Sequence, residues 1–182
     1  ALDLPVAIGL LVASGQIPGS QIEGLGAFGE LGLDGSVRPI VGALPLVDAV
    51  HAQRVVVPAA DARVTALIAG SRIRPVRCLR DVVDALHYGL PWPNVDLSLP
   101  NDPVEPEPDL ADVRGQGQAR GALEVAAAGG HHVLLVGPPG AGKTMLARRL
   151  PGILPDLAHE DALTVTRVHS AAGLRLPPSG LV

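Results

Sequence analysis

Hydrophobic positions over residues 1–89 alternate between helical spacing and short continuous apolar runs. Asp3 is placed to cap the first helix, and Asp34-Gly35 is placed to form the turn between the first two strands. Such mixing of helices and strands predicts one mixed α/β domain with its own core. The pattern predicts helices over Leu4–Ser14, Ala43–His51, Ala60–Ile68 and Leu79–His87, and strands over Leu25–Leu33, Val37–Ile40, Arg54–Val57 and Ile73–Val76.

The segment from Leu90 to Asp109 interrupts this pattern. It contains six prolines and five acidic residues but no basic residue. Because proline removes backbone donors and like charges repel, we predict an extended linker over residues 90–109. Trp92 is expected to anchor the linker against a domain face. The predicted organisation is therefore a domain over 1–89, the linker, and a second domain over 110–182.

After the linker, an Ala-rich stretch predicts a helix over Gln118–Ala128. His132–Val136 is a continuous apolar run, which is typical of a parallel strand covered on both faces. A further helix is expected over Met145–Leu150, where Pro151 would end it. These elements predict the start of a second α/β domain with a parallel sheet.

Residues 137–144 match the pattern G-x-x-x-x-G-K-[ST] between the expected strand and helix. Glycine lets the backbone wrap closely around a phosphate, and the loop amides and helix N-terminus donate to it. Lys143 would reach the β- and γ-phosphate oxygens, and the Thr144 hydroxyl would bind the Mg²⁺ of Mg-ATP. The predicted cofactors are thus ATP and Mg²⁺, bound by Gly137, Pro138, Pro139, Gly140, Ala141, Gly142, Lys143, Thr144 and Met145.

Hydrolysis needs more than this loop. A carboxylate at the end of a second apolar strand normally helps to hold magnesium and water. Asp156, Glu160 and Asp161 follow the loop, but no apolar run leads into any of them. The arginines Arg148, Arg149, Arg167 and Arg175 are expected on a solvated or phosphate-facing surface. We therefore assign no catalytic residue, and expect nucleotide binding rather than complete turnover.

Composition and charge exclude several classes of function. The net charge is −4, and the linker alone contributes −5. One Phe, one Tyr and one Trp exclude an aromatic base-stacking platform, and the single Cys78 excludes a disulfide or a multi-cysteine zinc site. Leu4–Ala13 is too short to span a bilayer, so no membrane contact and a cytoplasmic location are expected. Since the chain begins at Ala1, we expect a piece of a longer protein.

The second half resembles the magnesium-chelatase-like AAA+ ATPases of the YifB/ComM type. The matching motifs are D-x-x-G-Q at Asp112–Gln116, the loop through Ala147, R-L-P-G-I-L-P around Leu150–Pro155, and the H-S-x-A-G-like stretch Val168–Gly173. The resemblance implies that Val113 and Gly115 contact the adenine base. It also implies a homo-oligomeric ring, such as a hexamer, that acts on DNA, with branch migration in natural transformation as the implied role.

The first half resembles the Lon-protease-like domain of the same family. Lon proteases use a Ser–Lys dyad, in which the lysine amine deprotonates the attacking serine. The serine stretch reads here as Asp3–Ile8, and Pro39–Ala43 is followed by Leu44 in place of the lysine. Both catalytic positions are apolar, and the only lysine, Lys143, lies in the phosphate loop. The domain is therefore expected to keep the Lon-like fold without protease activity.

Two other functions remain open from the sequence. One is an ATPase subunit of a magnesium chelatase that inserts metal into a porphyrin, although an attached Lon-like domain argues against it. The other is a non-enzymatic module that senses nucleotide and holds partners together.

Overall fold

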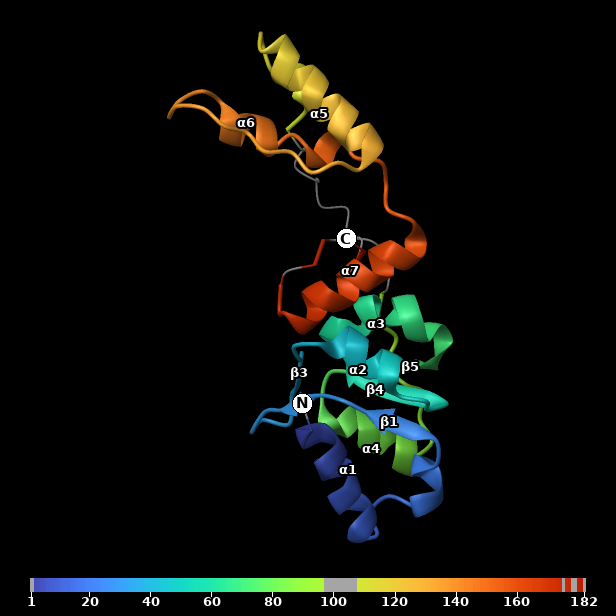
Figure 1. Cartoon of the computed structure of the whole chain (residues 1–182). Coiled ribbons are helices and arrows are strands. Elements are labelled where there is room, and N and C mark those ends of the chain that lie inside the picture. Colours follow the sequence, from blue (N-terminus) through green and yellow to red (C-terminus); the bar gives the residue numbers. More distant parts are fainter. Residues whose placement is uncertain (1, 97–107, 175, 178–179, 182) are drawn as a thin grey trace. The chain divides into compact units, whose positions relative to one another are not determined.

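The computed structural model describes residues 2–96, 108–174, 176–177 and 180–181. Its contacts divide the chain into two compact units (Figure 1). The first unit comprises Ala1–Asn101 together with His159–Val182, and the second comprises Asp102–Ala158. The domain boundaries expected at 89/90 and 109/110 stay predictions, because the compact units divide the chain at other positions.

The first unit is built on a three-stranded parallel sheet of order β1-β4-β5. Its strands are β1 (Leu25–Ala27), β4 (Arg54–Pro58) and β5 (Ile73–Val76). A separate antiparallel pair, β2 (Glu30–Leu31) and β3 (Val37–Arg38), forms a short hairpin. The fold class predicted from the sequence, a mixed α/β chain with a parallel sheet, is confirmed.

Two pairs of helices cover the two faces of this sheet (Figure 1). Val55 and Val57 point to one face, where α2 and α3 pack, and Val56 points to the other, where α1 and α4 pack. All three valines are fully buried, because successive residues of a strand alternate between its faces. The four helices are α1 (Asp3–Ala13), α2 (Ala43–Ala49), α3 (Ala62–Ala69) and α4 (Leu79–His87).

The long strand expected over Leu25–Leu33 is wrong, because the segment divides between two sheets. Phe28 still follows β1, and its amide donates to the Val56 carbonyl at 3.0 Å. At Gly29 the segment no longer pairs with β4 and passes close to α1, where the Leu4 amide donates to the Gly29 carbonyl at 3.2 Å. A Cβ at Gly29 would lie 2.8 Å from Val37 Cγ1. The crossing of α1 and β3 at this point explains the break.

The expectation that Asp3 caps the first helix is wrong. It is the first residue of α1, and Leu2 occupies the capping position without a side-chain hydrogen bond. The Asp3 carboxylate instead accepts a 3.4 Å hydrogen bond from the amide of Leu31, on the neighbouring hairpin. A tertiary contact has replaced the local one.

The turn at Asp34-Gly35 is confirmed. Gly35 adopts a φ of 80°, and Asp34 Oδ1 accepts hydrogen bonds from the Ser36 hydroxyl at 2.6 Å and the Ser36 amide at 3.0 Å. These two bonds, led by that of the hydroxyl, lower the pKa of the Asp34 carboxyl. Trp92 packs against the face of the first unit that α1 and α4 cover, as expected, whereas residues 97–107 of the linker lie outside the described residues.

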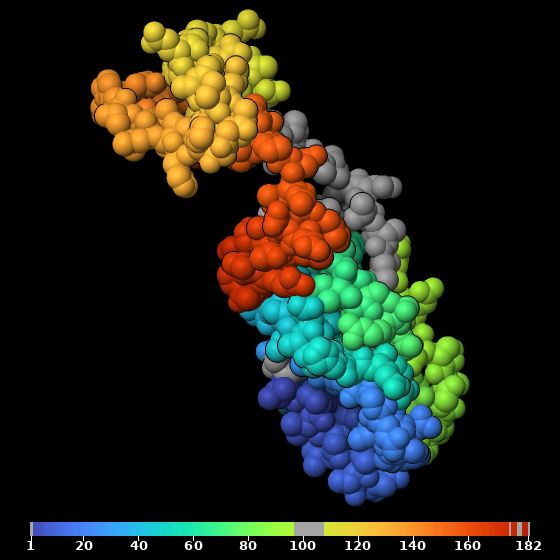
Figure 2. Space-filling view, turned by 45° about the vertical axis from the view of Figure 1, so that its right-hand side comes forward, coloured from blue at the N-terminus to red at the C-terminus, as the bar shows by residue number. Residues whose placement is uncertain are grey.

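Helix α7 (His159–Ala171) belongs to the first unit and packs against α2. In Figure 2 its atoms, coloured red to orange, lie against those of α2 and α3. Arg167, expected on a solvated or phosphate-facing surface, is partly exposed and forms an ion pair, with its Nε 3.0 Å from Asp48 Oδ2 on α2. The Gly42 amide, at the start of α2, donates to the Ser170 carbonyl at 3.0 Å. Arg175 lies outside the described residues.

The second unit contains α5 (Gly117–Gly129), which confirms the helix expected over Gln118–Ala128, and the short α6 (Lys143–Ala147). Short 3-10 turns lie at Leu110–Asp112 and Pro151–Ile153. The helix expected over Met145–Leu150 therefore starts and ends earlier, and Pro151 opens the next turn rather than ending the helix. Four buried side chains form the core of this unit: Leu110, Val113, Leu123 and Leu146.

The strand expected over His132–Val136 is not formed. Leu134 and Val136 are 86% and 85% exposed, and only Leu135 packs against the core of the second unit. A parallel strand is stable only when a neighbour accepts and donates its ladder of hydrogen bonds. Within the described part of the second unit, no strand is present to do so. The run therefore has the composition of a buried strand, but it pairs with no strand among the described residues.

Candidate nucleotide-binding site

The candidate site is the loop over residues 137–144, which leads directly into α6. Gly140 and Gly142 adopt φ values of 79° and 80°, in the left-handed region that L side chains rarely occupy. The Ala141 amide donates to the Pro138 carbonyl at 3.3 Å, which closes the loop on itself. The two glycines are thus required by the path of the backbone before any ligand is considered.

The start of α6 presents unused backbone donors. Among the described residues, no backbone carbonyl accepts from the amides of Gly142, Lys143 or Thr144. The first amides of a helix have no partner within the helix, and their dipoles favour an anion at that end. Within the loop, Gly140, Ala141 and Thr144 are exposed. The geometry supplies an open, electropositive set of donors suited to a phosphate group.

The Lys143 amine is held beside the loop. Its Nζ donates to the carbonyl oxygens of Gly137 and Pro138, at 2.7 Å each. These contacts fold the side chain back over the loop that it would serve. Thr144 and Met145 follow it on α6 and are both exposed. Pro139 lies between the two halves of the loop and is exposed as well.

The two residues expected to contact the adenine base, Val113 and Gly115, differ in their surroundings. Val113 is only 3% exposed, and its side chain belongs to the core of the second unit. A contact of Val113 with adenine would therefore have to use its backbone. Gly115 has a φ of 71°, and nothing lies within 4 Å of the position that a Cβ would take. Both contacts with the adenine base stay predictions.

Gln116 is a residue whose role the motif alone did not reveal. It is the one non-glycine among the described residues with positive φ, at 53°. Its Nε2 donates to the Ala141 carbonyl at 3.4 Å, within the phosphate loop. The D-x-x-G-Q motif contained this residue, but only the tertiary structure brings it to residues 141–142.

The positions of the lost protease dyad are both apolar in the structure. Val6 lies on α1 and is 59% exposed, and Leu44 lies on α2 and is fully buried. Neither side chain can deprotonate or attack a carbonyl group. The acidic residues Glu160 and Asp161 lie in the first turn of α7, where they add no strand-end carboxylate.

Together, the fold and the loop define the class of chain: a mixed α/β domain followed by a segment that carries the G-x-x-x-x-G-K-T loop. Two family models match the sequence. Residues 109–180 match the magnesium chelatase subunit ChlI family, and residues 1–61 match the family described as subunit ChlI of Mg-chelatase.

Individual relatives agree with these matches. An uncharacterized protein of Mycobacterium tuberculosis is 45% identical over 94% of this chain and 35% of its own length. YifB of Escherichia coli is 41% identical over 88% of this chain and 32% of its own length. Competence protein ComM of Haemophilus influenzae is 36% identical over 92% of this chain and 34% of its own length. The chain belongs to the magnesium-chelatase-like YifB/ComM family, and it spans about a third of the length of these relatives.

The Lon-like interpretation of the first unit has its own support. An archaeal Lon protease of Archaeoglobus fulgidus is 35% identical over 88 residues, which are 47% of this chain and 14% of that protein. Among the described residues, no helix has both the length and the apolar character needed to cross a membrane.

Proposed function

We propose that this chain binds Mg-ATP at residues 137–144 and forms the nucleotide-binding part of an AAA+ ATPase of the YifB/ComM type. The observation that carries the proposal is the loop itself. Two left-handed glycines are followed by amides at the start of α6 that donate to no backbone carbonyl of the described residues. This arrangement suits the β-phosphate of a nucleotide.

Each loop residue then has a distinct role. On binding, the Lys143 amine leaves the carbonyls of Gly137 and Pro138 and moves to the β- and γ-phosphate oxygens. The Thr144 hydroxyl, exposed on α6, coordinates Mg²⁺. Val113, through its backbone, and Gly115 contact the base. The remaining members of the site shape the loop: Pro138, Pro139, Gly140, Ala141, Gly142 and Met145.

For the whole protein we propose a cytoplasmic, homo-oligomeric ring, such as a hexamer, that uses ATP to process DNA. Support comes from the relative named as competence protein ComM, which matches most of this chain. Branch migration of DNA taken up during transformation is the activity that we assign to such a motor. In a ring, an arginine from a neighbouring subunit would complete the site at the γ-phosphate.

A nucleotide titration tests the binding step. The 182-residue chain is titrated with ATP and Mg²⁺ by isothermal calorimetry, alongside Lys143→Ala and Arg80→Ala. A hydrogen bond to a charged group contributes about 1.5–3 kcal/mol, so Lys143→Ala should weaken binding by roughly tenfold or more. Arg80 is exposed on α4 in the other unit, so its variant should bind as the wild type does. Equal affinity of Lys143→Ala and the wild type would refute the assignment.

A second assay separates the three functions considered for the whole protein. ATP turnover is measured on the full-length protein that contains this chain. Stimulation by branched DNA supports the motor, whereas stimulation by Mg²⁺ with a porphyrin supports a chelatase subunit. Nucleotide binding without turnover under either condition supports the non-enzymatic module.

A further inference from the structure

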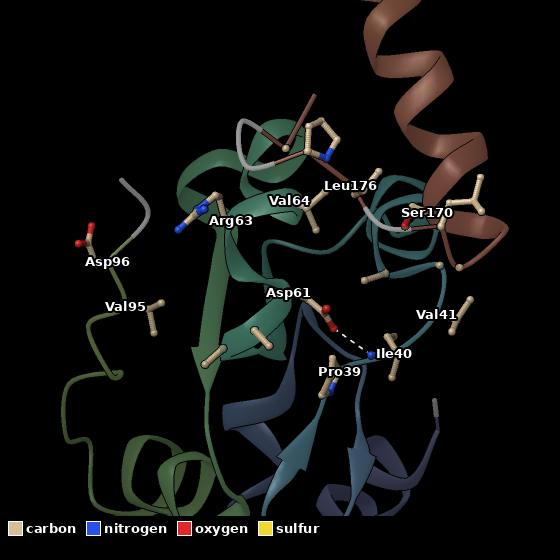
Figure 3. Close-up of a pocket in the computed structure, with 18 residues that line it drawn as sticks. Pro39, Ile40, Val41, Asp61, Arg63, Val64, Val95, Asp96, Ser170 and Leu176 are labelled. Atoms are coloured by element: carbon tan, nitrogen blue, oxygen red, sulfur yellow. Dashed lines mark hydrogen bonds between the residues drawn. The ribbon is translucent and has the colours of Figure 1, made fainter. Parts of the chain in front are cut away.

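The first unit contains a cavity that neither the phosphate loop nor the lost protease dyad uses. Its volume is about 660 Å³, and it lies where β4 ends and where the chain leaves β3 (Figure 3). Residues 39–43 and 59–64 form one side, and residues near the end of α7 form another. In parallel α/β sheets, ligands commonly bind at the carboxyl ends of the strands.

Most lining residues of this cavity have apolar side chains, although nearly half of the exposed wall surface is polar. Ile40, Ala43, Val64 and Val95 are among the lining residues. Among the described residues, the charged lining residues are Asp61, Asp96 and Arg63, two acidic and one basic. A small-molecule pocket typically has about 300–1,000 Å³, apolar walls and a few placed polar groups. This cavity has a volume in that range and a few placed polar groups, and its walls combine apolar side chains with polar surface.

Asp61 places a partly buried carboxylate at this cavity. It ends the 3-10 turn Ala59–Asp61 after β4, and its Oδ2 accepts a 3.0 Å hydrogen bond from the Ile40 amide. In Figure 3 its carboxylate lies between the loop over Pro39–Val41 and the start of α3. Burial raises the pKa of this carboxyl, and the Ile40 hydrogen bond only partly opposes that effect. Within the part of the chain that the structure describes, no cation pairs with Asp61.

We propose that this cavity binds a primary ammonium group carried on an apolar chain, with the ammonium paired to the Asp61 carboxylate. A charge-assisted hydrogen bond is about twice as strong as a neutral one, and partial burial strengthens the attraction further. The apolar walls receive the hydrocarbon part of the ligand. The excess of acidic over basic side chains among the described lining residues favours a cation over an anion.

The ammonium group has two possible sources, a free aliphatic amine or the side chain of a lysine in a peptide. Both present the same chemistry to Asp61. A peptide would also have to place its backbone near the mouth of the cavity, where Val41 is 71% exposed. The experiment therefore includes one probe of each kind.

The test titrates the 182-residue chain with n-hexylamine in phosphate buffer and follows backbone amide shifts by NMR. Saturable shifts are expected at Ile40, Gly42 and Ser170. 1-Hexanol has a similar chain without the charge and should bind at least tenfold more weakly. A tripeptide Leu-Lys-Leu, blocked at both ends, replaces the amine in a second series. Tighter binding of the tripeptide identifies a peptide lysine as the source, and tighter binding of hexylamine identifies a free amine.

Three variants test the placement. Asp61→Asn keeps an oxygen that can accept from the Ile40 amide, so the fold should persist while affinity for hexylamine falls at least tenfold. Val64→Phe fills part of the cavity and leaves the Asp61 side chain in place, so it should reduce the affinity for hexylamine. Asp34→Asn removes a carboxylate from the hairpin turn and should leave binding unchanged. The proposal is overturned if neither probe binds, if 1-hexanol binds as well as hexylamine, or if either cavity variant binds with wild-type affinity.

Discussion

Replacing Gly142 by Ala perturbs the phosphate loop at a position where the structure allows the cost to be worked out. Gly142 has a φ of 80°, and an L residue in this region costs about 1–2 kcal/mol. A Cβ there would lie 2.9 Å from Gln116 Nε2 and 3.3 Å from Met145 Cε. Both atoms end flexible side chains, so Gln116 would move and lose its 3.4 Å hydrogen bond to Ala141. That loss adds at most about 0.5–1.5 kcal/mol.

Gly140 is the matched comparison. Its φ is 79°, but nothing lies within 4 Å of the position of its Cβ. Gly140→Ala should therefore cost only the conformational part, about 1–2 kcal/mol, against about 1.5–3.5 kcal/mol for Gly142→Ala. If the free loop relaxes to negative φ and must return on binding, ATP affinity falls about five- to thirtyfold for Gly140→Ala. The decrease is larger for Gly142→Ala.

If the loop instead keeps its conformation without ligand, the same free energy appears as lost stability of the second unit. The assay therefore combines ATP titration with urea unfolding of each variant. Gly121→Ala, in the interior of α5 with open space around its Cβ, serves as control. It should raise stability by up to about 1 kcal/mol and leave binding unchanged. The reasoning is refuted if Gly140→Ala and Gly142→Ala match the wild type in both affinity and unfolding.

Asp34 and Asp61 should respond to pH with opposite signs. Hydrogen bonds from Ser36 lower the pKa of Asp34 below 3.8, so its stabilisation is present at neutral pH and is lost as pH falls through the folded-state pKa. Burial raises the pKa of Asp61 above 3.8, so its contribution is present below 3.8 and is lost as pH rises through the raised value. The free energy of unfolding is measured with urea for the wild type, Asp34→Asn and Asp61→Asn between pH 3 and 7. As pH falls, the stability of the wild type relative to Asp34→Asn should decrease. Its stability relative to Asp61→Asn should increase. Parallel pH profiles would contradict this. The Arg167–Asp48 pair, with side chains 36% and 38% exposed, should give a coupling of about 0.2–1 kcal/mol in a double-mutant cycle with Ala, and less in 1 M salt; zero coupling at low salt would count against the pair.

Features that depend on neighbouring residues were predictable from the sequence. The turn at Asp34 follows from a side chain that accepts from residues two positions ahead, and the left-handed glycines follow from the loop pattern. The buried run Val55–Val57 identified β4, because such a run needs cover on both faces. These signals operate within a few residues and need no knowledge of the rest of the fold.

Features that depend on distant residues were not predictable. The run over His132–Val136 has the composition of a strand, but pairing requires a neighbour that no local pattern supplies. The division of the segment over Leu25–Leu33 depends on where α1 crosses it. Asp61 carried no motif, and its interest arises only because folding brings Ile40 and a cavity to it.

The sequence by itself therefore determined the G-x-x-x-x-G-K-T pattern, the apolar residues at the two dyad positions and the mixed α/β class, because residue type and short spacing decide each of them. A single lysine cannot serve both an ATP site and a protease site, whatever the fold. The tertiary structure decided which strands pair and where Arg167 finds its partner. It also placed at a cavity the Asp61 carboxylate, which pairs with no cation in the described part of the chain. Those outcomes depend on burial and on contacts between residues far apart in the chain, which a linear pattern does not contain.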